Sequence, residues 1–375
     1  MTDSPARSTE VGIIAPDRPE GGLFRDAETI CWALSGIRGL SSSVIKVREN
    51  LYTKDYAACT NETLELVHPS NCARLPVKLT MTDWLAKLDC VVILEALNPS
   101  LLDLVFRSPK TKRILYIPNL EWATLDPYAD DTKPWIKQLR SYGQRVVCVA
   151  RSESIQRRLA ENGITSDLLR WSIPDAVRTR DHSLRRPAHP IRVLYNAGNH
   201  GFRDRRGSDI VANALGQWPH SFPKLKVFIK SNEPHSALDA VPSRANLEIK
   251  SSRGFLQSRD KIMELYDKAD VVLYPSRFEG FGLGLLEALH RGCYVLATRG
   301  DPMQDMLDPA SLRIDAKLTG HVRLAPSYEP NPASLIDALG KIACNPELLR
   351  SQQSGHLKSR QEDFCDNLLR LVRHG

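Results

Sequence analysis

The 375-residue sequence has little of what marks membrane, secreted or zinc-binding proteins. No stretch approaches the roughly 18 consecutive apolar residues of a membrane-spanning helix, and the polar first ten residues do not predict a cleavable leader. The eight cysteines form no Cys-x-x-Cys pair, which argues against a zinc site and a disulfide framework. These absences predict a globular protein of the reducing cytoplasm.

No Asp-x-Asp triplet occurs either, so the usual carboxylate pair for a diphosphate-bound Mg²⁺ is missing. Positive charge is present instead: the net charge is +7, and residues 1–175 contain 22 residues of each sign, so the whole excess lies in the second half. Such a bias suits nucleic acid, an anionic membrane or a phosphorylated ligand, and a solvated basic linker is an equal alternative for the arginines before Pro190.

Short runs of Val, Ile and Leu alternate with longer amphipathic segments, which predicts an α/β fold with parallel sheets. Strands are expected at 11–15, 43–47, 64–67, 90–94, 113–117, 145–150, 192–196, 226–230, 247–250, 270–274 and 294–298. Helices are expected at 22–36, 134–142 and 152–162, and from residues 207, 258, 282 and 331. Ser152 and Gly163 fit the caps of the third helix.

The alternation breaks between residues 173 and 190, where Pro, Arg, His and Ser dominate as in a linker. We therefore expect one α/β domain at 1–175 and a second at 176–345. Residues 346–371 read as a helix, which predicts that 346–375 pack back toward the first domain.

The most specific stretch runs from Tyr274 to Ala288, with the sequence Tyr-Pro-Ser-Arg-Phe-Glu-Gly-Phe-Gly-Leu-Gly-Leu-Leu-Glu-Ala. It follows an apolar strand and turns directly into a helix, whose first N–H groups and positive dipole end suit a diphosphate. Those groups belong to Phe281, Gly282 and Leu283. Glu287 lies about one turn into the helix, where its carboxylate suits the two hydroxyls of a ribose.

These residues resemble retaining, nucleotide-sugar-dependent glycosyltransferases of the family 4 type, which have the GT-B architecture of two facing Rossmann-like domains. The resemblance covers residues 246–298 best and includes the spacing Glu-x7-Glu, from Glu279 to Glu287. It implies that Glu279 contacts donor-sugar hydroxyls and that Glu287 contacts the ribose. It also implies that backbone groups of Gly254, Phe255 and Leu256 hold the nucleotide base.

A second stretch, residues 196–207, resembles the family's Gly-Arg…Lys-Gly element, in which two cations grip the leaving diphosphate. Arg206 stands at the Lys position, but Gly201 stands where the family has its Arg. Either Arg203 or Arg205 supplies the missing charge. The alternative interpretation is an exposed basic turn.

The resemblance implies that residues 176–345 form the nucleotide-sugar donor domain and residues 1–175 the acceptor-side domain, but it is weaker in the first half. Gly21 and Gly22 follow the first strand, where the family has a glycine-rich loop near the donor phosphate. The segment Ile117–Trp122 stands where many members carry an active-site His, so that Asn119 or Glu121 takes its place or this chain does without it. A polar strand end with Trp122 packed beneath it is the structural alternative.

The resemblance thus implies a metal-independent hexosyltransferase that retains the anomeric configuration, needs no cofactor and takes a nucleoside-diphosphate sugar as donor. Arg206, neighbouring arginines and the helix start replace the metal. The acceptor stays open between a glycan, a lipid-linked or small acceptor, and a hydroxylated base in DNA, for which the cluster at 107–113 offers a basic patch. Peripheral membrane contact also stays open. The alternatives are a GT-B epimerase, a sugar phosphorylase and a non-catalytic nucleotide-sugar-binding module.

Overall fold

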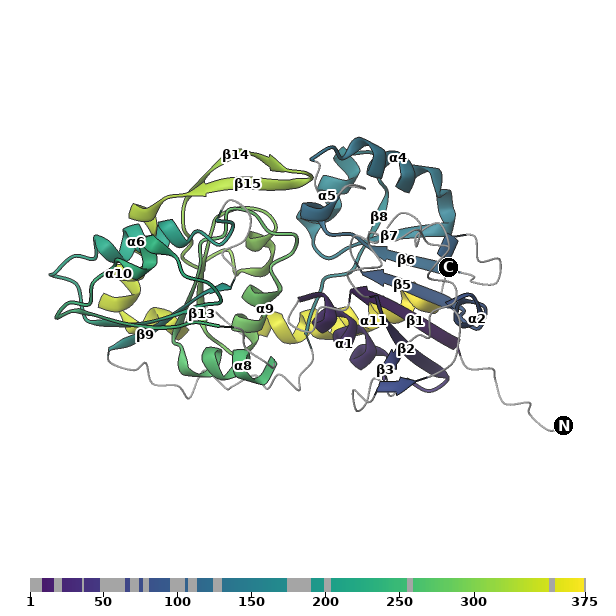
Figure 1. Cartoon of the computed structure of the whole chain (residues 1–375), viewed down its shortest axis with the longest axis horizontal. Helices are drawn as coiled ribbons and strands as arrows, with labels where there is room; N and C mark the ends of the chain where they lie inside the picture. Colours follow the sequence, from purple (N-terminus) through teal and green to yellow (C-terminus); the bar gives the residue numbers. More distant parts are fainter. Residues whose placement is uncertain are drawn as a thin grey trace. The chain divides into compact units, whose positions relative to one another are not determined.

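The structure is a computed structural model, and it describes residues 9–16, 22–35, 37–47, 65–67, 74–76, 81–94, 105–106, 113–123, 130–173, 190–198, 204–254, 259–350 and 355–373. The chain divides into two compact units, each with its own sheet (Figure 1). The first unit comprises Met1–Pro174 and Arg360–Gly375, and the second comprises Asp175–Ser359.

The sheet of the first unit has eight strands in the order β4-β3-β2-β1-β5-β6-β7-β8. Six strands pair in parallel, as the runs of apolar residues predict, but β3 and β4 join one edge antiparallel. The expectation of an all-parallel sheet is therefore wrong at that edge, where three-residue strands carry too little pattern to reveal their direction. The strands are β1 (Thr9–Pro16), β2 (Leu40–Val47), β3 (Glu65–Val67), β4 (Arg74–Pro76), β5 (Cys90–Leu94), β6 (Arg113–Ile117), β7 (Val146–Ala150) and β8 (Ser166–Leu168).

Helices of the first unit begin and end close to where the sequence predicts. Ser152 caps α5, because its hydroxyl accepts a hydrogen bond from the Ile155 N–H at 3.5 Å. The Gly163 N–H donates to the Ala160 carbonyl at 2.8 Å and closes the same helix. The helices are α1 (Gly22–Leu34), α2 (Met81–Leu85), α4 (Lys133–Ser141) and α5 (Glu153–Glu161), with 3₁₀ turns at Leu120–Trp122 and Gly143–Arg145.

The C-terminal segment returns to the first unit from Arg360 onward. The Arg360 Nε–H donates to the Trp171 carbonyl at 2.7 Å, and the Phe364 ring packs edge-on against the Trp171 ring at 5.2 Å between centroids. The expectation of one continuous helix over 346–371 is wrong. A 3₁₀ turn at Pro346–Arg350 occupies the first part of this range, and α11 (Gly355–Arg373) begins only at Gly355.

The second unit contains a five-stranded parallel sheet in the order β11-β10-β9-β12-β13. Alternate residues of the strands pack with α6 and α10 in one buried core, and α8 lies at the opposite face of the sheet. The strands are β9 (Ile191–Gly198), β10 (Leu225–Ser231), β11 (Leu247–Ser252), β12 (Val271–Tyr274) and β13 (Tyr294–Ala297); the helices are α6 (Ser208–Gly216), α7 (Ser236–Asp239), α8 (Arg259–Lys268), α9 (Leu283–His290) and α10 (Pro332–Cys344), with a 3₁₀ turn at Met303–Met306.

Two features of this unit bear on function. The chain crosses from β9 to β10 in one direction and later to β12 in the other, so the carboxyl ends of β9 and β12 form a topological switch point, the usual place for a ligand in such sheets. The second feature is an antiparallel ribbon of β14 (Ala316–Val322) and β15 (Ala325–Pro330), which the sequence does not predict. Its residues are mostly exposed or half-buried and lack an apolar face.

Candidate functional site

Two loops meet at the carboxyl ends of β9 and β12. The first carries Arg205, Arg206 and Gly207, and the second runs from Pro275 to Glu279. The N–H of Arg277 in the second loop donates to the Arg205 carbonyl at 2.8 Å. The two backbones approach so closely that a Cβ atom on Gly207 would stand 2.3 Å from the Pro275 carbonyl oxygen. This contact fixes where the two arginines of the first loop lie relative to the second.

Glu279 forms ion pairs with both arginines. Arg206 Nη1 lies 2.6 Å from Glu279 Oε1, and Arg205 Nη1 lies 3.1 Å from Oε2. Arg206 Nη1 also donates to the Tyr274 hydroxyl at 2.7 Å. The Glu279 side chain is 4% exposed, whereas the two arginine side chains are 21% and 25% exposed and so stay within reach of a ligand. Two cations against one carboxylate leave the cluster with a positive charge.

The protonation states of this cluster follow from its burial and its cations. Burial raises the pKa of Glu279, but Arg206 and then Arg205 outweigh that effect and hold the pKa below its ordinary value. Burial raises the pKa of the Tyr274 hydroxyl above its ordinary value, although Arg206 opposes the change. At neutral pH the cluster therefore contains a carboxylate, a neutral phenol and two guanidinium groups.

The lowered pKa of Glu279 predicts a loss of stability in acid. A carboxyl group whose pKa is lower in the folded state stabilises the protein fully above its unfolded value of about 4.5, and this contribution disappears as the pH falls through the folded pKa. In denaturant titrations, we expect the free energy of unfolding to fall below about pH 4.5, and Glu279→Gln to flatten this slope. Glu264→Gln, at an exposed pair with Lys261, serves as control. An unchanged slope in Glu279→Gln would contradict the assignment.

The start of α9 adds backbone donors beside this cluster. Its cap is Gly282 with φ +96°, a conformation that favours glycine, so no side chain occupies the first N–H groups of the helix. A Cβ atom on Gly282 would lie 3.9 Å from the Tyr274 hydroxyl, which places the helix start next to the partner of Arg206. This geometry fits the predicted anion-binding turn.

The N–H groups at the start of α6 are bonded within the protein. Asp204, with φ +48°, accepts hydrogen bonds from the N–H groups of Ser208 and Asp209, both at 3.0 Å. Its carboxylate therefore already occupies the helix end that begins after Gly207. Arg205 and Arg206 alone supply the positive groups of this loop among its described residues, and Arg203 lies outside the described range.

Glu287 lies on α9 with no exposed surface, so its carboxylate is closed to a ligand in this structure. Phe281 and Leu283 are also buried, at 3% and 8% exposure. Only their backbone groups, and not their side chains, are suited to meet a ligand.

Lys230 is a buried cation, absent from the residues expected from the sequence, that contacts one of them. It ends β10 and is 2% exposed, and its ammonium group donates to the Gly254 carbonyl and, at 2.9 Å, to the Ser231 carbonyl. Burial lowers the pKa of Lys230. The contact ties the strand end to the segment expected to hold the base, of which Phe255 and Leu256 lie outside the described residues. Lys226, on the same strand, is exposed, so the sequence of β10 does not distinguish the buried lysine from the exposed one.

In the first unit, the Asn119 side chain bonds to its own turn. Its side-chain oxygen accepts the Glu121 N–H at 3.0 Å and caps the 3₁₀ turn after β6, while the Asn119 side chain is 6% exposed. Trp122 is 39% exposed, so the alternative that it packs beneath the strand end is wrong. Gly22 begins α1, whereas Gly21 and most of the basic cluster at 107–113 lie outside the described residues.

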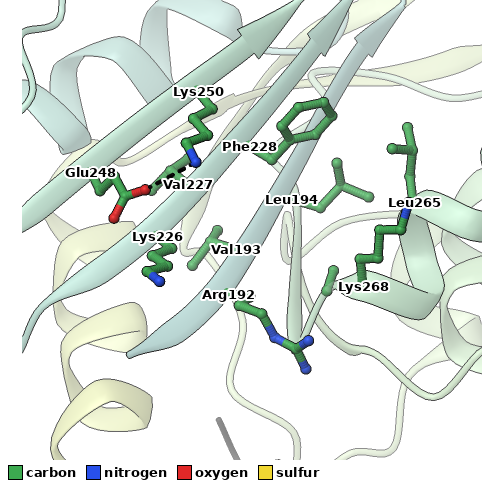
Figure 2. Close-up of a pocket in the computed structure, with 11 residues that line it drawn as sticks. Arg192, Val193, Leu194, Lys226, Val227, Phe228, Glu248, Lys250, Leu265 and Lys268 are labelled. Atoms are coloured by element: carbon green, nitrogen blue, oxygen red, sulfur yellow. Dashed lines mark ion pairs between the residues drawn. The ribbon is translucent and has the colours of Figure 1, made fainter. Parts of the chain in front are cut away.

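Part of the positive charge lies away from this cluster. A cavity of about 300 Å³ lies between α8 and the strands β9, β10 and β11, and Phe228 is among its lining residues (Figure 2). Its cations lie away from the Arg205–Arg206 loop, because Arg192 and Lys226 stand near the amino-terminal ends of β9 and β10 and Lys268 ends α8. The positive charge of the second half is therefore divided between at least two places, the Arg205–Arg206 loop and this cavity. The basic side chains around the cavity are Arg192, Lys226, Lys250 and Lys268.

Neither a metal site nor a membrane span is found within the described part of the chain. No group of three or more His, Cys, Asp or Glu side chains there is placed to hold a metal ion. None of the helices in those ranges is long and apolar enough to cross a bilayer.

Comparison with known proteins places this site in context. Residues 209–350 match the family described as Glycosyl transferases group 1, a range that includes Glu279 and Glu287. The O-antigen biosynthesis glycosyltransferase WclY of Escherichia coli is 28% identical over 180 residues, which is 45% of this chain and 45% of that protein. The similarity thus spans about half the length of that relative.

Solved structures match over nearly the whole chain. Sucrose-phosphate synthase from Thermosynechococcus elongatus has a TM-score of 0.59 and 11% identity, covering 97% of this chain and 95% of that one. WaaG, a glycosyltransferase involved in lipopolysaccharide biosynthesis, has a TM-score of 0.55 and 15% identity, covering 98% and 100%. At these identities the likeness concerns the fold, and it confirms the predicted GT-B class with two Rossmann-like halves.

Proposed function

We propose that this chain is a glycosyltransferase that moves a hexose-type sugar from a nucleoside diphosphate to an acceptor hydroxyl. The observation that carries the proposal is the cluster of Arg205, Arg206 and Glu279 at the switch point between β9 and β12. The cluster lies in the unit that contains the group 1 match, and its exposed guanidinium groups suit a diphosphate.

We further propose that the transfer is metal-independent and retains the anomeric configuration. Arg206 and Arg205 neutralise the leaving diphosphate, and the N–H groups at the start of α9 bind its oxygens. The bond from the anomeric carbon to the phosphate oxygen breaks while the acceptor oxygen attacks from the same face. The proton of the acceptor hydroxyl passes to the departing phosphate. No enzymic nucleophile is required, and positioning supplies much of the rate.

The two glutamates take different parts in this proposal. Glu279 holds the two guanidinium groups and also accepts a hydrogen bond from a hydroxyl of the donor sugar, which requires its carboxylate, 4% exposed here, to become accessible when the donor binds. Glu287 binds the ribose hydroxyls, which requires its buried carboxylate to become accessible when the donor binds. In the first unit, Gly22 is assigned to the donor phosphate, and Glu121 is assigned to the position of the family's active-site His.

We propose a glycan acceptor in preference to a hydroxylated base in DNA. Two similar proteins, WclY and WaaG, are glycosyltransferases of O-antigen and lipopolysaccharide biosynthesis. We also propose the cytoplasm as the compartment, because Cys31, Cys90, Cys148 and Cys293 are buried free thiols. Burial raises the pKa of Cys90 and Cys148 to about 12, which keeps these two thiols protonated and unreactive.

A donor screen tests the function. The full-length protein is incubated with UDP-, GDP-, ADP- and dTDP-sugars, and nucleotide release is measured with pools of glycans, lipid-linked sugars and DNA digests. We expect one donor to release nucleotide only with a glycan acceptor, and mass spectrometry to show one added hexose. Epimerised donor without acceptor, dependence on inorganic phosphate, or binding without turnover would instead identify the epimerase, the phosphorylase or the binding module.

A further inference from the structure

Arg277 uses every hydrogen-bond donor of its guanidinium group. Nη1 donates to the Asp204 carbonyl at 3.1 Å and to Asp209 Oδ1 at 2.8 Å, and Nη2 donates to Asp209 Oδ2 at 2.8 Å and to Glu329 Oε1 at 2.9 Å. Nε donates to Glu329 Oε2 at 3.1 Å. Five donors in one plane therefore join three segments of the second unit, and the Arg277 side chain is only 13% exposed.

These segments surround the loop that carries Arg205 and Arg206. Asp204 precedes the two arginines and Asp209 lies in the first turn of α6, so Arg277 holds both ends of the turn between them. Glu329 belongs to β15, which is tied to Arg277 a second time, because the Tyr328 N–H donates to the Arg277 carbonyl at 2.8 Å. Arg277 with its partners Asp204, Asp209 and Glu329, called the clamp below, thus connects the loop of Arg205 and Arg206, called the arginine loop, to the antiparallel ribbon.

The clamp also affects the charge beside the proposed diphosphate site. Asp209 and Glu329 carry negative charges that repel a phosphate, and Arg277 is their shared counter-ion. Burial raises the pKa of Asp209, but its bonds to Arg277 outweigh this and bring the pKa to about 2, so the carboxylate stays ionised and paired. Arg277 thus keeps both carboxylates paired beside the loop that carries Arg205 and Arg206.

We propose that Arg277 is the positioning residue of the donor site, which fixes the Asp204–Gly207 turn against β15 and so sets where Arg205 and Arg206 meet the diphosphate. The proposal rests on the function proposed above. Arg277 contacts the site residues through the backbone and through two aspartates, and it is not assigned a contact with the donor.

Calorimetric titration of the full-length protein with UDP, GDP, ADP and dTDP tests this role. For the nucleotide that binds the wild type, we expect Arg277→Met to raise the Kd and the donor KM about tenfold and to leave the acceptor KM unchanged. Arg277→Lys should resemble Arg277→Met, because an ammonium group has three donors and cannot span the same partners. Glu329→Gln, which loosens the clamp from its exposed side, should raise the Kd about two- to threefold.

A double-mutant cycle separates positioning from general destabilisation. If Arg277 acts through the arginine loop, adding Arg277→Met to Arg206→Met should change the Kd less than twofold. Arg192→Met is the matched control, because Arg192 makes a bidentate pair with Asp270 at the amino ends of the strands, and it should leave the Kd unchanged.

The outcomes are distinct. A wild type that binds none of the four nucleotides would count against the proposed function itself. A wild type that binds, with unchanged Kd in Arg277→Met and Glu329→Gln or with fully multiplicative effects in the cycle, would overturn the positioning role alone.

Discussion

Replacing Arg206 by methionine should lower kcat/KM for sugar transfer by about 10²- to 10³-fold, with the donor concentration varied. Arg206 is the most exposed member of the cluster and stands 2.6 Å from Glu279 and 2.7 Å from the Tyr274 hydroxyl. Methionine keeps much of the side-chain volume but removes the charge that would stabilise the leaving diphosphate. Initial rates of nucleotide release, with the donor identified by the screen, measure the effect.

Arg244→Met is the control for this substitution. Arg244 donates to the carbonyls of Leu215 and Gly216, at the other end of α6, so its loss removes hydrogen bonds of an arginine without touching the cluster. We expect kcat/KM within about twofold of the wild type for Arg244→Met. Equal rates for Arg206→Met and the wild type, with both folded, would remove Arg206 from the site.

Gly207→Ala should be the most disruptive small substitution in the second unit. Gly207 has φ +70°, which strains a residue with a Cβ atom, and that atom would lie 2.3 Å from the Pro275 carbonyl oxygen. Because backbone cannot move aside as a flexible side chain can, the two loops must separate. We expect a loss of roughly 2–4 kcal/mol in the free energy of unfolding and loss of nucleotide binding.

Gly216→Ala provides the comparison on the same helix. A Cβ atom on Gly216 meets no atom within 4 Å, and its φ is not positive, so stability should change by less than about 1 kcal/mol. Urea unfolding and nucleotide titration of both variants measure the difference. A Gly207→Ala protein with wild-type stability and binding would show that the contact between the two loops does not shape the site.

The strands and the glycine-rich turn could be predicted because their signals are local. β12 consists of Val271, Val272, Leu273 and Tyr274, all of them buried. A continuous apolar run of this kind is typical of a parallel strand that is covered on both faces. Gly282 follows within the same stretch, so the strand, the turn and the helix α9 were predicted together.

The cluster itself could not be assembled from sequence, because its parts are distant in the chain. Arg206 and Glu279 are 73 positions apart, and they meet only because β9 and β12 are neighbours in the sheet. Arg277 lies within the Tyr274–Ala288 stretch, but its role could not be predicted, because its partners Asp209 and Glu329 lie 68 and 52 positions away. The ribbon that carries Glu329 was missed altogether.

The central claim is that Arg205 and Arg206 hold a nucleoside diphosphate without a metal ion. Calorimetric titration of the full-length wild type and of Arg206→Met with the nucleotide product of the active donor, in EDTA and again in Mg²⁺, tests it most directly. We expect the same Kd for the wild type in both solutions and a Kd at least tenfold higher for Arg206→Met. Binding that requires Mg²⁺, or that is unchanged in Arg206→Met, would contradict the claim.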